Sequence, residues 1–194
     1  MTKKRITIID GHPDPDRGRF IHALSDSYGV GAEAAGHDVR RIDIADLHFG
    51  LISTRTDWET VSAPKDIADA QDAIAWADHV VILYPLWLGD VPALLKGFFE
   101  QALRPGFAFQ PHKGGLPEKR LAGRTAHIVV TMGMPAIFYR FFFGAHSVRS
   151  LERNILNFVG IKPVARSLIG NIESDAAQRD NWLRTMNERG AAAH

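Results

Sequence analysis

The sequence of 194 residues predicts an α/β fold, with a five-stranded parallel sheet in the spatial order 2-1-3-4-5 and helices on both faces. Short apolar runs alternate along the chain with longer helical patterns, which is typical of parallel sheets with crossover helices. Loops with the character of ligand-binding segments follow the first, third and fourth runs, and right-handed crossovers leave few other strand orders. We expect one domain over residues 1–194, because a chain of this length with 45% hydrophobic residues builds one sizeable core.

The first predicted strand is a buried apolar run, the second alternates apolar and polar residues, and the third contains the purely apolar run 80–83. The five runs span residues 6–9, 39–44, 79–84, 125–131 and 163–169. Five helices are predicted between and after them: residues 19–35, a helix from Pro64, a helix from Pro92 to Leu103, residues 145–159 and residues 174–188. The connections 47–64 and 104–123 carry no clear periodicity and are predicted to be irregular.

Local signals support the helix assignments. Phe20, Leu24 and Tyr28 recur on one face of the first helix, which Gly36 then ends. Pro64 suits the start of a helix, since its missing N–H has no partner there in any case. Ser174 is a candidate N-cap for the last helix.

Composition excludes several classes of protein. The net charge of +1 gives no basic excess for nucleic acid, and the absence of cysteine excludes disulfides and thiolate chemistry. The nine histidines include no pair four residues apart, so we predict no metal site. No apolar run approaches the ~20 residues that a membrane helix needs, and we expect a cytoplasmic protein.

The loop after the third strand is the most informative segment. Pro85 and Pro92 bracket an aromatic turn that contains Trp87, at the edge of the sheet where ligands bind. Prolines stiffen the loop, and its free backbone amides suit a flat, partly polar ring such as a flavin isoalloxazine. The candidate contact residues are Pro85, Leu86, Trp87, Leu88 and Gly89. The alternative is a packing turn with buried Trp87 and Leu88.

The first loop lies between the first strand and the first helix, where helix N-terminal amides favour phosphate. His12, Arg17 and Arg19 add donors and positive charge, and Phe20 and Ile21 open the helix. Asp14 and Asp16 oppose an anion unless they point to solvent. The alternative is a polar surface turn.

The fourth loop combines small and aromatic residues. Thr131, Met132 and Gly133 end the strand, where a hydroxyl and a bare backbone can approach a ring. The aromatic run 138–143 indicates a subunit interface, a lid over the core or the wall of a substrate pocket. Tyr139 and His146 are its candidate catalytic groups, because Tyr and His stabilise a developing anion.

Together these residues resemble the NAD(P)H:quinone oxidoreductase family, which has a flavodoxin-like fold, a three-layer sandwich, and includes DT-diaphorase, the modulator-of-drug-activity proteins and the ancillary subunits of Kef potassium-efflux systems. The strongest part of the resemblance is the segment Pro85-Leu86, Val91-Pro92-Ala93, Leu95-Lys96-Gly97-Phe98-Phe99-Glu100, followed by Gly106-Phe107-Ala108-Phe109. His12, Phe20, Ala23-Leu24, Thr131 and Gly133 match more loosely.

The resemblance implies a tightly bound flavin and a homodimer with the site at its seam. It implies that His12 and residues 19–21 hold the flavin phosphates, that residues 85–88 contact the isoalloxazine, and that Thr131 and Gly133 border the ring. Tyr139 and His146 would then face the substrate and the flavin O2 side. The longer first loop favours FAD, with FMN as the alternative.

The main hypothesis is therefore a flavin-dependent enzyme that takes hydride from NAD(P)H and passes two electrons to a quinone or similar aromatic acceptor. One shared stacking site would give ping-pong kinetics, and the flavin would supply the redox chemistry. The alternative is a regulatory subunit of a potassium-efflux type transporter, with the run 138–143 as its docking patch. A weaker alternative is an azo- or nitroreductase. The sequence does not distinguish NADH from NADPH as the electron donor.

Overall fold

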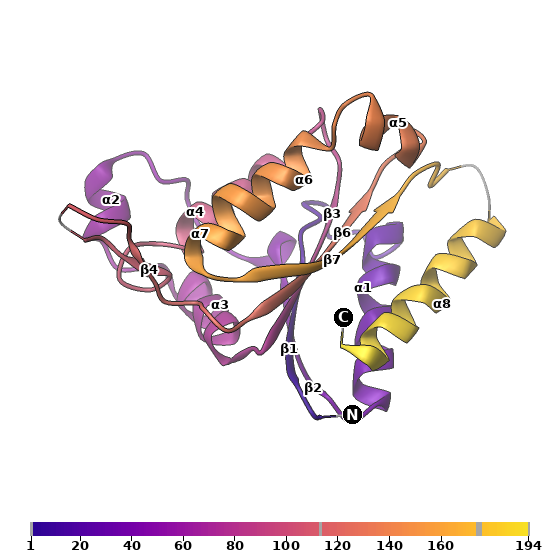
Figure 1. The fold of residues 1–194 in the computed structure, drawn as a ribbon, viewed down its shortest axis with the longest axis horizontal. Helices are drawn as coiled ribbons and strands as arrows, with labels where there is room; N and C mark the ends of the chain where they lie inside the picture. The colour runs from indigo at the N-terminus through magenta and orange to yellow at the C-terminus, as the bar shows by residue number, and fades with distance from the viewer. Residues whose placement is uncertain (1, 113, 174–175, 194) are drawn as a thin grey trace.

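The computed structural model describes residues 2–112, 114–173 and 176–193. Its main sheet has five parallel strands in the order β2-β1-β3-β6-β7, which is the predicted order 2-1-3-4-5 (Figure 1). The strands are β1 (Arg5–Asp10), β2 (Asp38–Asp43), β3 (His79–Pro85), β6 (Thr125–Thr131) and β7 (Lys162–Ile169). The predicted fold class is confirmed.

The register of the central strands determines where the loops lie. Asp10 at the end of β1 pairs with Leu83 of β3, and Pro85 at the end of β3 pairs with Thr131 at the end of β6. β3 is buried along its whole length, as expected of a strand covered on both faces. The loops that follow β1, β3 and β6 therefore start at the same edge of the sheet.

Two helices cover one face of the sheet (Figure 1). They are α1 (Phe20–Ala34) and α8 (Ala176–Ala192), which pack side by side. Gly31 of α1 and Gly190 of α8 allow this approach: a Cβ at Gly31 would lie 2.0 Å from the backbone oxygen of Asn187, and one at Gly190 would lie 2.0 Å from that of Tyr28.

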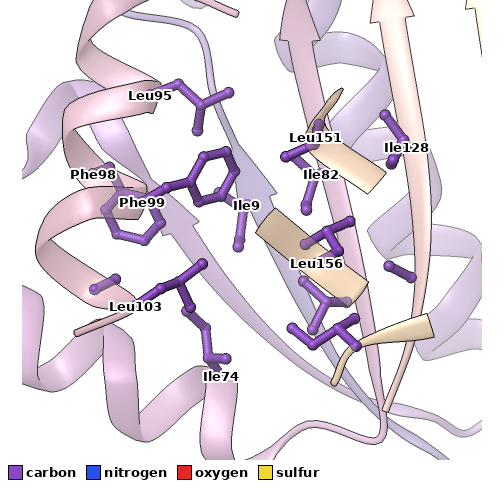
Figure 2. Packing of buried hydrophobic residues seen from close by; sticks show 14 of the residues in the cluster. Ile9, Ile74, Ile82, Leu95, Phe98, Phe99, Leu103, Ile128, Leu151 and Leu156 are labelled. Atoms are coloured by element: carbon purple, nitrogen blue, oxygen red, sulfur yellow. The ribbon is translucent and has the colours of Figure 1, made fainter. Parts of the chain in front are cut away.

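The other face carries the larger core. Its helices are α3 (Lys65–Trp76), α4 (Ala93–Ala102), α6 (His146–Ser150), the π-helical segment η2 (Leu151–Leu156) and α7 (Asn157–Val159). Leu95, Phe98 and Phe99 of α4 project toward Ile9 and Ile82 of the sheet (Figure 2). This packing follows from the apolar spacing of residues 94–103, which places one stripe of α4 against the strands.

The structure adds short elements that the sequence did not predict. These are η1 (Ile44–Asp46), α2 (Arg55–Glu59), the β4 (Phe109–Gln110) and β5 (Glu118–Lys119) hairpin, and α5 (Ala136–Phe141). A capping box between Thr54 and Asp57 starts α2, which is too short for a periodic signal. The predicted helix 145–159 is interrupted by η2, and the candidate N-cap Ser174 lies outside the described residues.

Within the described residues, no helix combines the length and apolar character needed to cross a membrane.

The contact between α1 and α8 yields a stability prediction. Gly31→Ala should lower the free energy of unfolding by roughly 1–3 kcal/mol, because its methyl group would overlap the α8 backbone. Gly29→Ala in the same helix is the matched control: its Cβ would lie 3.5 Å from Ile8, an ordinary contact, so better helix propensity should leave stability equal or higher. Urea denaturation measures both, and equal effects of the two substitutions would contradict the prediction.

Candidate active site

Three loops meet at the carboxyl edge of the sheet, and backbone hydrogen bonds hold them together. The N–H of Gly11 donates to the carbonyl of Leu83 at 2.7 Å, and the N–H of Leu86 donates to the carbonyl of Thr131 at 2.8 Å. The ring of His12 packs edge-on against that of Trp87, with 5.8 Å between centroids. The first, third and fourth loops thus converge as the sequence predicted.

The third loop forms a tight turn whose tip is open to solvent. Trp87 and Asp90 exchange both backbone hydrogen bonds, and the two residues between them, Leu88 and Gly89, have positive φ angles of 48° and 80°. This is the pattern of a type I′ turn, which matches the twist of the flanking chain. Leu88 is 107% exposed and Trp87 is 47% exposed, so neither is buried as a packing turn would require. Among the described residues, the N–H groups of Leu88 and Gly89 have no acceptor.

The first loop ends at the N-terminus of α1. A helix leaves its first N–H groups without intrahelical partners, and those of Phe20 and Ile21 find no other acceptor in the described chain. The side chain of Ile21 is in the core, and that of Phe20 is half-buried. Both residues are therefore available to a ligand through their backbone, at the positive end of the helix dipole.

The two arginines of this loop are held by carboxylates. Arg17 pairs with Asp43 of β2 at 2.9 Å, and Arg19 pairs with Asp14 at 2.6 Å. All of these groups are at least partly exposed, so a phosphate can compete for either guanidinium at small cost. The structure thus places Arg17 and Arg19 beside the helix N-terminus with their charge already neutralised.

The fourth loop brings an open backbone to the same edge. Thr131 and Met132 are buried, whereas Gly133 is exposed and a Cβ there would touch nothing within 4 Å. The N–H of Met132 donates to the carbonyl of Ile169 at 2.8 Å, but that of Gly133 has no acceptor in the described chain. Gly133 therefore offers space and a free donor together.

Tyr139 and His146 occupy different environments. Tyr139 is buried, its hydroxyl lies 2.5 Å from Oγ of Ser147, and it accepts a hydrogen bond from the N–H of Val148 at 3.3 Å. This hydroxyl is thus engaged within the fold. His146 is exposed at the start of α6.

The aromatic run around Tyr139 does not cover the core. Phe138, Phe141, Phe142 and Phe143 are between 48% and 80% exposed in this chain. Of the three expectations for residues 138–143, a lid over the core is therefore wrong. The physical reason is that α5 buries only Tyr139 of this run, while its phenylalanines and the two that follow the helix stay at the surface.

Two residues at the site carried no recognisable motif in the sequence: Asp10, the last residue of β1, and His22, in the first turn of α1. They form a buried pair with 2.6 Å between Oδ2 of Asp10 and Nδ1 of His22. A carboxylate that directly follows an apolar strand is the signal that could have found Asp10, whereas the sequence holds no such signal for His22. The His22 ring also lies 5.3 Å from that of His12, between centroids.

His12 is neutral and has a defined tautomer. The N–H of Asp14 donates to its Nδ1 at 3.0 Å, so the ring proton is on Nε2. Burial, followed by the charge of His22, lowers the pKa of His12. The Nε2–H group is the donor that this side chain offers to a ligand.

These features fit a flavin. Free N–H groups of Phe20 and Ile21, with the Nε2–H of His12, suit the phosphate; free N–H groups of Leu88, Gly89 and Gly133 suit the polar edge of a ring. The open space at Gly133 and the exposed face of Trp87 border the place between them. A flat ligand with an anionic tail matches this arrangement better than a small globular one.

Known proteins resemble the chain at two levels. The sequence profile of the flavodoxin-like fold family (Flavodoxin_2) matches residues 4–189. The chain is 32% identical to the ribosyldihydronicotinamide dehydrogenase (quinone) of Homo sapiens, over 85% of this chain and 80% of that protein. It is 28% identical to an uncharacterized NAD(P)H oxidoreductase of Haemophilus influenzae, over 85% and 83%. The chain therefore belongs to the flavodoxin-like family that includes these oxidoreductases, and the resemblance seen in the sequence is confirmed.

Solved structures agree on the fold. The NAD(P)H:quinone oxidoreductase from Methanothermobacter marburgensis superposes with a TM-score of 0.82 at 23% identity, over 100% of both chains. An FMN-dependent NADH-azoreductase from Bacillus anthracis, solved with FMN, superposes with a TM-score of 0.75 at 15% identity, over 97% of this chain and 99% of that one. At these identities the likeness shows the fold alone.

A shorter match concerns a transporter component. The potassium-efflux system ancillary protein KefG of Cronobacter sakazakii is 36% identical over 75 residues, which cover 39% of this chain and 38% of that protein.

The neutral state of His12 yields a pH prediction. Because folding lowers the pKa of His12, the unfolded chain binds this proton more readily, and stability falls as the pH drops through the ordinary histidine range near 6.5. His12→Asn keeps an acceptor for the N–H of Asp14 but does not titrate. Between pH 7.5 and pH 5 the wild-type chain should lose more unfolding free energy than the variant. Urea denaturation at each pH measures the unfolding free energy, and the same dependence on pH in both proteins would refute the prediction.

Proposed function

We propose that the protein is a flavin-dependent NAD(P)H oxidoreductase that reduces quinones or similar aromatic acceptors by two electrons. The observation that carries the proposal is the meeting of three loops at one edge of the sheet, with N–H donors at two separate places that have no acceptor among the residues that the structure describes. One set, at the start of α1, suits an anion, and the other suits the edge of a planar ring. The family of the chain supports the same reading.

Each group has a specific role in this proposal. The N–H groups of Phe20 and Ile21 and the Nε2–H of His12 bind the flavin phosphate, and Arg17 and Arg19 exchange a carboxylate for it. Leu86, Trp87 and Leu88 contact the ring, which Pro85 and Pro92 keep in place. A bound flavin supplies the transfer of two electrons between NAD(P)H and the acceptor.

The polar edge of the ring needs donors where negative charge develops on reduction. The N–H groups of Leu88, Gly89 and Gly133 meet that need, because preorganised donors stabilise charge without reorganisation. Thr131 and Met132 support the backbone beneath the ring. His146, which is exposed, is the polar side chain of the fourth loop that we propose faces the acceptor, while Tyr139 holds Ser147 and the start of α6 in position.

A second copy of the chain completes the site in this proposal. Trp87 and Leu88 expose apolar surface at the third loop, and residues 138–143 do so at the fourth. Exposed apolar side chains at two loops of one edge favour an interface that also encloses the ligand. We propose FAD as the cofactor because the first loop is long, with FMN as the alternative. The electron donor is either NADH or NADPH. A cytoplasmic location stays a prediction.

The test of this function begins with the colour of the purified protein. The protein should absorb visible light as a flavin does and release FAD or FMN on denaturation. It should oxidise NAD(P)H with a quinone as acceptor, and plots of reciprocal rate against reciprocal NAD(P)H concentration at several quinone concentrations should be parallel. Parallel lines follow because donor and acceptor use one stacking site in turn. A chain that takes up neither flavin refutes the proposal.

The second candidate is a regulatory subunit of a potassium-efflux type transporter. The exposed phenylalanines of residues 138–143 and the short match to KefG favour it. It predicts bound flavin with negligible quinone turnover until the transporter is added, whereas the enzyme turns over alone. An azoreductase with the same flavin chemistry would reduce azo dyes faster than quinones.

Gly133 gives a substitution test for the position of the ring. Gly133→Val places two methyl groups in the open space without a clash inside the chain, so folding stability should be unchanged. Flavin binding should weaken by roughly tenfold or more, since a loss of ~1.4 kcal/mol of contact free energy has that effect. Gly50→Val is the matched control, because Gly50 also has open space around its Cβ position and lies away from the three loops. Fluorescence titration with FMN and FAD measures both, and an unaffected Gly133→Val would exclude the ring from this place.

A further inference from the structure

Asp10 and His22 form the most buried ionisable pair at the site. Asp10 is 1% exposed and His22 is 3% exposed, and they join the end of β1 to the first turn of α1. Both ring nitrogens of His22 have oxygen partners: Nδ1 lies 2.6 Å from Oδ2 of Asp10, and Nε2 lies 2.9 Å from the carbonyl oxygen of Asp14. Nothing in the proposed chemistry so far uses this pair.

The partners of His22 determine its protonation. A carbonyl oxygen only accepts, so Nε2 carries a proton and donates to Asp14. Nδ1 lies at hydrogen-bond distance from Oδ2 of Asp10, so one further proton lies between the ring and this carboxyl group. Both nitrogens of His22 are therefore hydrogen-bonded, and Nε2 is fixed as a donor, as a buried polar group requires.

The same pair controls the path of the first loop. The free oxygen of Asp10, Oδ1, accepts the backbone N–H of His12 at 3.2 Å, while His22 holds the carbonyl of Asp14. Hydrogen bonds to this pair thus hold the backbone of the first loop at residue 12 and again at residue 14. This anchoring brings the N–H of Asp14 to Nδ1 of His12, which leaves the His12 proton on Nε2.

We propose that His22, hydrogen-bonded to Asp10, is a positioning residue that presets both the first loop and the tautomer of His12 for the phosphate group of the cofactor. This inference rests on the proposed function for the identity of the ligand, but the placement of the protons is independent of it. His22 itself touches no ligand in this scheme. It acts through His12 and through the carbonyl of Asp14.

A merely structural role would have different consequences. A buried polar cluster that only joins β1 to α1 would, when broken, weaken all ligand binding and folding together. A positioning role affects the phosphate contacts selectively, because the ring contacts come from the third and fourth loops. Riboflavin, which has the ring but no phosphate, separates the two.

The first experiment needs no substitution. Nitrogen-15 NMR of the ring nitrogens in the wild-type chain without flavin, at neutral pH, should show His22 with a protonated Nε2. His12 should show an unprotonated Nδ1 and a protonated Nε2, and the signals are assigned by their loss in His22→Gln and His12→Asn. An unprotonated Nε2 in His22, or His12 with its proton on Nδ1, overturns the proposal.

The second experiment measures affinity for riboflavin, FMN and FAD by fluorescence titration. His22→Leu should weaken FMN and FAD by roughly tenfold, because a buried acceptor left unpaired costs on that scale, while riboflavin stays within about twofold. His22→Gln, whose amide still donates to the carbonyl of Asp14, should recover most of the loss. His112→Leu, an exposed histidine away from the three loops, is the control.

The possible results separate the two proposals. Equal weakening of all three ligands, or none, overturns the positioning role but leaves the flavin proposal standing. A wild-type chain that binds no flavin refutes the proposed function, and the ring-nitrogen signals then still decide whether His22 presets His12. If His22→Leu does not fold, Asp10→Asn/His22→Gln replaces both members of the buried pair by amides and tests the same selectivity, with an equal loss for riboflavin overturning the inference.

Discussion

Parallel pairing of β1, β3 and β6 is the constraint on which the site depends. Because the strands run in the same direction and in register, their carboxyl ends lie at one edge and their following loops emerge together. Backbone hydrogen bonds from Gly11 to Leu83, from Leu86 to Thr131 and from Met132 to Ile169 then tie each loop to the neighbouring strand. The site is thus an extension of the sheet and shares its rigidity, which suits a cofactor that must be held at a fixed distance from its substrates.

The electrostatics of the first loop follow a consistent pattern. The arginines and the buried histidine there each have a carboxyl partner: Arg17 with Asp43, Arg19 with Asp14 and His22 with Asp10. The unbalanced positive potential comes from the helix N-terminus, whose N–H groups are fixed in space. Donors that are fixed before binding lose little entropy when an anion arrives, and this advantage exceeds what a flexible free arginine supplies.

The third loop combines a strained backbone with an exposed apolar side chain. Leu88 has a left-handed backbone conformation that a non-glycine residue adopts at a cost of roughly 1–2 kcal/mol, and its side chain is fully exposed. Neither feature stabilises the fold of the single chain. A contact between the apolar side chain and a ligand or a second subunit would offset the strain that the tight turn imposes.

The amino-acid sequence by itself determined the strand order, the five strands to within one or two residues, and the three loops that form the site. These follow from local periodicity and from the general handedness of crossovers, which act over a few residues or apply to all chains. His12, Trp87 and Gly133 were found because each lies at the end of a strand. Short elements such as α2 and the break at η2 were not predictable, since a few residues carry no periodic signal.

Only the tertiary structure decided how side chains that are distant in sequence pair with one another. It engaged the hydroxyl of Tyr139 with Ser147, neutralised Arg17 through Asp43, and turned the phenylalanines of residues 138–143 to the surface. It also joined Asp10 to His22 across the first loop, a contact for which neither residue carries a motif. The physical reason is that protonation, pairing and exposure depend on the packing of the whole chain, whereas strands and helices depend mainly on the spacing of nearby residues.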